Sequence, residues 1–145
     1  MGHLDARTLL IAEIPILLLV GGLILAAALL GRRERTLGWT GAALLLMGVG
    51  FLLGVADPGS AWQQSVSRFG ALLILAHACV WTGLRAFSGK PPLWLWIVAG
   101  PLAWFAVCQW PGFVFSGVAR GIAYGLPTLA YTGAALWELG FDPRG

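Results

Sequence analysis

A chain of 145 residues that is 59% hydrophobic and only 10% charged cannot cover a soluble core with a polar surface. Its formal net charge of +3 does not indicate a nucleic-acid partner, because the basic residues lie at the ends of apolar runs and form no patch. Composition therefore predicts an all-α integral membrane protein.

Five apolar runs with short connectors occupy most of the chain. A helix needs roughly 20 apolar residues to cross the hydrocarbon core of a bilayer, and the runs are close to that length. They cover residues 8–31, 37–56, 66–87, 93–110 and 117–139. Because short connectors make consecutive helices antiparallel neighbours, we expect a five-helix transmembrane bundle in a single membrane domain over residues 1–145.

The basic residues predict how this bundle is oriented. One side of the expected bundle carries six of the nine Lys and Arg residues, namely Arg32, Arg33, Arg35, Arg85, Lys90 and Arg144. The other side carries Arg7, Arg68 and Arg120. Cytoplasmic connectors carry the excess of basic residues. We therefore expect the N-terminus outside and the C-terminus in the cytoplasm.

Glycines at four-residue spacing mark helix faces that can pack closely. Gly50 and Gly54 lie in the second run, and Gly117, Gly121 and Gly125 lie in the fifth. Small residues at this spacing let two backbones approach in a membrane. These faces pack either within this chain or against another subunit.

Glu13 is the most unusual side chain within a predicted span. A carboxylate about five residues inside the first run is costly in hydrocarbon, so it should face the bundle interior, a wet cavity or a cation. Arg120 and Arg68 lie toward the same predicted side. These three residues could form a polar intramembrane cluster through a Glu13–Arg120 or Glu13–Arg68 pair. Alternatively, Glu13 belongs to an outer ligand or proton site, or reaches water by itself.

His77 lies near the middle of the third run, and the other histidine, His3, is at the chain end. An isolated histidine within a span is most often a hydrogen-bonded packing residue. It could also ligate haem or the magnesium of a chlorophyll-type pigment. The sequence requires no cofactor and offers no other metal ligand set.

The residue patterns of common enzymes are missing. The chain contains no Gly-rich phosphate loop, no paired His/Glu metal motif and no Gly-x-Ser-x-Gly elbow. The three aspartates, Asp5, Asp57 and Asp142, lie outside the predicted spans, so they complete no Ser-His-Asp set with His77. We predict no catalysis by this chain.

Three stretches carry a resemblance to a known family. They are residues 4–10 (LDARTLL), residues 82–92 (TGLRAFSGKPP) and residues 134–139 (AALWEL), and an Arg-rich connector before Leu37-Gly38-Trp39 fits as well. Together they resemble the N-terminal multi-span membrane domain of bacterial diguanylate cyclases of the GGDEF class. The resemblance implies a sensory or anchoring module in the bacterial inner membrane.

The chain contains no Gly-Gly-Asp-Glu-Phe sequence before it ends at Gly145, so the cyclase activity is not carried over. We expect either a part of a longer protein or a descendant without its output domain. The second hypothesis is an accessory subunit of a respiratory or photosynthetic complex, packed against other helices, lipids or pigments. Expected partners are membrane lipids and either other membrane subunits or a second copy of the chain.

Overall fold

The computed structural model describes residues 6–31, 34–56, 62–110, 112–113 and 115–140. These residues form five α-helices and no strand. The helices are α1 (Ala6–Leu30), α2 (Arg35–Ala56), α3 (Trp62–Phe87), α4 (Trp94–Cys108) and α5 (Gly117–Gly140). Among the described residues, three helices contain segments long and apolar enough to cross a membrane, namely Ile11–Leu30, Arg35–Val55 and Arg68–Phe87. The apolar helix α4 is shorter.

The helices coincide with the five apolar runs, and they differ mainly at two ends. Helix α3 begins at Trp62, four residues before its apolar run. Helix α4 ends at Cys108, where the N–H groups of Gln109 and Trp110 donate to carbonyls three residues back and tighten the chain. Pro15, Pro101 and Pro127 lie inside helices, as their positions in the runs predict. The sequence Asp57-Pro58-Gly59-Ser60 predicts a turn after the second run, and these residues lie outside the described residues.

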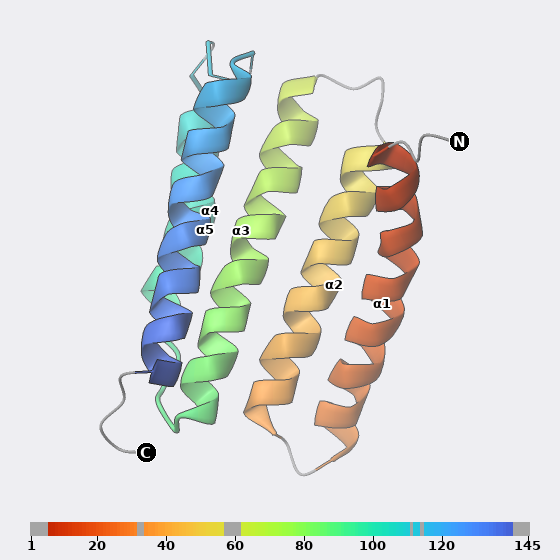
Figure 1. Cartoon of the computed structure of the whole chain (residues 1–145), viewed down its shortest axis with the longest axis vertical. Coiled ribbons are helices and arrows are strands. Elements are labelled where there is room, and N and C mark those ends of the chain that lie inside the picture. Colours follow the sequence, from red (N-terminus) through yellow and green to blue (C-terminus); the bar gives the residue numbers. More distant parts are fainter. Residues whose placement is uncertain (1–5, 32–33, 57–61, 111, 114, 141–145) are drawn as a thin grey trace.

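The five helices do not surround one common axis (Figure 1). Helices α1, α2 and α3 form a row, and α4 and α5 lie at the end of the row away from α1. Helix α3 packs against α2, α4 and α5, whereas α1 packs against α2 alone. Helix α3 is therefore the element that joins the two parts of the fold.

The core follows from this arrangement. In α3, Ile74, Ala76 and Ala78 are fully buried. One cluster joins α3 to α4 and α5 around Trp104 and Tyr131, and a smaller one joins α3 to α2. The hydroxyl group of Tyr131 donates a hydrogen bond to the Trp96 carbonyl and so connects α5 to α4.

Glycines make the contact between α1 and α2 close. A Cβ atom at Gly41 would lie 2.7 Å from the backbone nitrogen of Leu25, and one at Gly21 would lie 2.9 Å from that of Leu45. Both distances are too short for real Cβ atoms, so only glycine fits at this crossing. Gly50 and Gly54 face α3, where a Cβ would meet Leu72 and Phe69 at 3.5 and 3.3 Å.

Candidate functional site

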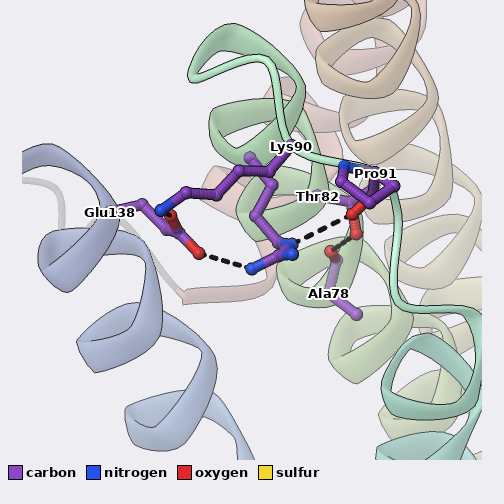
Figure 2. A network of polar contacts seen from close by, with 6 residues as sticks. Ala78, Thr82, Lys90, Pro91 and Glu138 are labelled. Atoms are coloured by element: carbon purple, nitrogen blue, oxygen red, sulfur yellow. Dashed lines mark hydrogen bonds and ion pairs between the residues drawn. The ribbon is translucent and has the colours of Figure 1, made fainter. Parts of the chain in front are cut away.

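A buried carboxylate joins the end of α5 to the end of α3 and to the segment between α3 and α4. Glu138, whose side chain is 6% exposed, accepts hydrogen bonds from Arg85 and Lys90. The Nη1 atom of Arg85 lies 2.6 Å from Oε1, and the Nζ atom of Lys90 lies 2.6 Å from Oε2. Each carboxylate oxygen therefore has its own cationic donor. Figure 2 shows Glu138 on α5 opposite Lys90 and Pro91 of the connector.

The C-terminus of α3 sets the position of Lys90. Gly89 has a φ of 70°, a left-handed conformation that glycine adopts without strain. The N–H of Lys90 donates to the Arg85 carbonyl at 2.8 Å, and that of Gly89 donates to the Ala86 carbonyl at 3.1 Å. This pair of bonds is the Schellman motif, which turns the chain sharply at a helix end. It places Lys90 beside Arg85, so both cations reach the same carboxylate.

Three contacts hold the Arg85 guanidinium in place. Besides Nη1 on Glu138, its Nε atom donates to the Pro91 carbonyl at 3.2 Å. The guanidinium carbon lies 5.4 Å from the centre of the Trp81 ring, a cation–π distance. One residue of α3 thus binds the connector and α5 together. Nearby, the buried Thr82 hydroxyl donates to the Ala78 carbonyl at 2.7 Å and needs no partner outside its helix (Figure 2).

The charges in this cluster are shielded unequally. The side chain of Arg85 is 14% exposed and that of Lys90 is 31% exposed, so Lys90 has the better access to solvent. A buried carboxylate is tolerated only when it is paired and hydrogen-bonded, and Glu138 meets both conditions. The three side chains together carry two positive charges and one negative charge.

The structure does not bring Glu13 to either of its expected partners. Glu13 is exposed on α1, and α1 contacts neither α3, which carries Arg68, nor α5, which carries Arg120. The reason is the row arrangement, in which α2 stands between α1 and the other helices. The side chain of Arg68, in the first part of α3, is exposed. Arg120 is half-buried and lines a cavity between α3, α4 and α5.

His77 is a half-buried residue of α3 that contacts α5. Its Nδ1 atom lies 2.7 Å from the Leu73 carbonyl oxygen, which can only accept, so Nδ1 carries the proton. Its ring meets that of Tyr124 edge-on, with 6.4 Å between the ring centres. These contacts are those of a packing residue. Among the described residues, no group of three His, Cys, Asp or Glu side chains could hold a metal ion.

The glycines of α5 are open rather than packed. A Cβ atom at Gly121 or Gly125 would meet nothing within 4 Å, and one at Gly117 would meet only the Arg120 side chain at 3.8 Å. Of the two alternatives for these glycines, packing within the chain is not seen at Gly121 and Gly125. Gly121 lines the cavity between α3, α4 and α5, and α4 contacts α5 little.

Sequence reasoning did not identify Glu138 as a site residue, although a signal was present. Glu138, Arg85 and Lys90 all lie at the ends of apolar runs on the same predicted side of the membrane. Opposite charges at one depth are candidates for pairing. Two of the three stretches that carry the family resemblance, residues 82–92 and 134–139, are those that meet in this cluster.

No family model, no curated protein and no solved structure matches the chain.

Proposed function

We propose that this chain is a non-catalytic membrane module of the sensory or anchoring type, whose output passes through the cytoplasmic end of α5. The observation that carries the proposal is the Arg85–Glu138–Lys90 cluster. It fixes the last turn of α5 to the last turn of α3 through Arg85, and to the connector that follows α3 through Lys90. A rearrangement among the helices that changes this contact would move the end of α5.

The distribution of apolar side chains supports a lipid environment. Large apolar residues are exposed on the outer faces of α1, α4 and α5, for example Leu23, Leu95 and Leu129 at 70%, 75% and 71%. Apolar patches of this extent are rare on soluble monomers, and a bilayer provides a solvent for them. The proposed orientation has α1 beginning outside and α5 ending in the cytoplasm, beside the basic connectors.

The family resemblance supports the same function. The stretches that resemble the membrane domain of diguanylate cyclases supply Arg85, Lys90 and Glu138. Their meeting in one ion-paired cluster gives these stretches a common physical role, the attachment of α5. In the proposed module this attachment determines the position of whatever cytoplasmic partner follows or binds α5.

A second candidate function is an accessory subunit of a larger membrane assembly. The open face of α5 favours it, because Gly121 and Gly125 leave room for the backbone of another helix. A subunit of this kind would bind unrelated chains in a fixed ratio. A sensory module would bind a second copy of itself.

Purification from native membranes in a mild detergent, followed by mass spectrometry of the intact assembly, distinguishes the two. The proposed module gives a homo-oligomer, with or without a cytoplasmic effector, whereas a fixed set of unrelated subunits contradicts it. A visible absorption spectrum of the same sample tests His77, because a haem or pigment band would assign it a ligand role.

The orientation is tested separately by cysteine labelling of intact cells. Glu34 and Gly112 are both exposed. Glu34 lies between α1 and α2 and Gly112 between α4 and α5, and these two connectors are at opposite ends of the helices. A membrane-impermeant maleimide should label Gly112→Cys and leave Glu34→Cys unlabelled. Cys79 and Cys108 are buried and give little background. Labelling of both variants, or of Glu34→Cys alone, would contradict the proposed insertion.

A further inference from the structure

A second cavity lies beside the ion-paired cluster, at the same end of the helices. Its volume is about 420 Å³, within the range of small-ligand sites. Its walls come from the start of α2, the end of α3, the connector over residues 89–92 and the start of α4. None of the sites described above uses this cavity, although Lys90 belongs to both the cavity and the cluster.

The side chains that line this cavity suit an anion. Arg35 from α2 and Lys90 from the connector both line it, and no acidic side chain in the described part of the chain does. A guanidinium and an ammonium group are the usual partners of a phosphate group in proteins. The Lys90 ammonium group also donates to Glu138, at 2.6 Å, and so links the cavity to the cluster.

Two indole rings form the aromatic part of the wall. Trp39 of α2 and Trp94 of α4 both line the cavity, and their ring centres are 5.7 Å apart at an angle of 55°. Indole rings prefer the headgroup level of a bilayer, where one edge is wet and the rest is apolar. A pair of phosphate-binding cations beside such rings is typical of a site that binds a lipid headgroup.

Exposed apolar side chains adjoin the same helix ends. Leu37 follows Arg35 by two residues and is 39% exposed, and Leu95 follows Trp94 and is 75% exposed. They offer apolar surface for acyl chains at the same helix ends as the cations, which a free inorganic anion would not use. The occupant that fits both the charge and the apolar surroundings is therefore an anionic lipid.

We propose that this cavity binds the phosphate-bearing headgroup of an anionic lipid in the leaflet that faces the basic connectors. Basic pockets between membrane helices on the cytoplasmic side have this role in general. Arg35 and Lys90 hold the phosphate. Because Lys90 also holds Glu138, occupancy of the cavity changes the attachment of α5, a step that rests on the proposed function.

The test measures lipid binding to the full chain, delipidated in a mild detergent. Phosphatidylglycerol and phosphatidylcholine are titrated separately and bound lipid is counted by native mass spectrometry. We expect phosphatidylglycerol to bind at least tenfold more tightly. Removal of one charge in Arg35→Gln should weaken its binding about fivefold, the typical contribution of one basic residue near a membrane surface. Arg68→Gln, which removes an exposed arginine at the opposite helix end, is the matched control and should bind normally.

Three results would overturn the lipid site. They are equal affinity for the two lipids, unchanged phosphatidylglycerol binding by Arg35→Gln, and binding of glycerol phosphate as tight as that of phosphatidylglycerol, which would indicate a free-anion site. Hydrogen exchange at residues 134–140 is measured in the same samples. Selective lipid binding without any change in that exchange would support the site and contradict the proposed output through α5.

Discussion

Glu138 and Arg85 are 53 residues apart in the chain, yet Arg85 Nη1 lies 2.6 Å from Glu138 Oε1 and both side chains are largely shielded from solvent. This contact joins the last turn of α5 to the last turn of α3. Since α3 is also the helix that contacts α2 and α4, the pair attaches α5 to the centre of the fold. A change in the packing of α3 would therefore be transmitted to the end of α5.

Removal of the Glu138 charge should destabilise the fold. In Glu138→Gln the two cations lose their anionic partner, and loss of one member of a buried pair costs about 3–5 kcal/mol. Lys90 is 31% exposed and reaches water, so we expect a smaller loss of about 1–3 kcal/mol in the free energy of unfolding. Denaturation in detergent micelles measures it. Glu34→Gln, an exposed glutamate at the same helix end, should leave stability unchanged.

Arg85 and Lys90 should respond differently to a swap of one basic residue for the other. Arg85 uses two separate nitrogen atoms and the face of its guanidinium, so Arg85→Lys loses the bond to the Pro91 carbonyl and the planar contact with Trp81. The Nζ atom of Lys90 donates to Glu138, a contact that arginine can also make. We expect Arg85→Lys to unfold at lower denaturant than Lys90→Arg. The reverse order would contradict the role given to Arg85.

Gly70 should not tolerate a side chain. A Cβ atom there would lie 2.3 Å from the Trp104 ring, which is itself packed against Phe113 and Tyr124 and cannot easily move. Gly70→Ala should therefore lower stability by about 1–3 kcal/mol through overpacking. Gly133→Ala is the control, because a Cβ there meets nothing within 4 Å. It should be neutral or stabilise its helix by up to about 1 kcal/mol.

The open face of α5 predicts where self-association occurs. If Gly121 forms part of the contact with a second copy, Gly121→Leu should weaken the oligomer at least ~10-fold, which corresponds to about 1.4 kcal/mol. Analytical ultracentrifugation in detergent measures it. Gly22→Leu places the same side chain at an open glycine of α1 and should associate normally. Equal association of both variants with the parent chain would exclude this face.

The apolar runs predict all five helices because a run of this length has few alternatives to a helix. The end of α3 nearest Trp62 is less predictable, since residues 62–65 are helical without belonging to the apolar run. The expected position of Glu13 near Arg68 and Arg120 depended on depth alone. Depth does not reveal which helices are neighbours, and α2 separates α1 from the rest.

The contact within the ion-paired cluster also could not be predicted from the sequence. Arg85, Lys90 and Glu138 share one predicted membrane side, so the sequence contains the charges but not their contact. Their meeting requires α5 to pack on α3 with one rotation about its axis, and it requires the left-handed turn at Gly89. The first depends on tertiary packing, whereas the second is a local turn at the end of α3. The close approach of α1 and α2 at Gly21 and Gly41 could not be predicted either. Its signal in the sequence is the two glycines themselves, and glycine is common in membrane helices.

The attachment of α5 by Glu138 is the central claim, and amide hydrogen exchange in the reconstituted full chain tests it most directly. Exchange at residues 134–140 is compared among the parent chain, Glu138→Gln and Glu34→Gln. We expect slow exchange in the parent and in Glu34→Gln, and exchange at least tenfold faster in Glu138→Gln, because the last turn of α5 loses its ion pairs with Arg85 and Lys90. Equally slow exchange in all three proteins would mean that the cluster does not hold the end of α5.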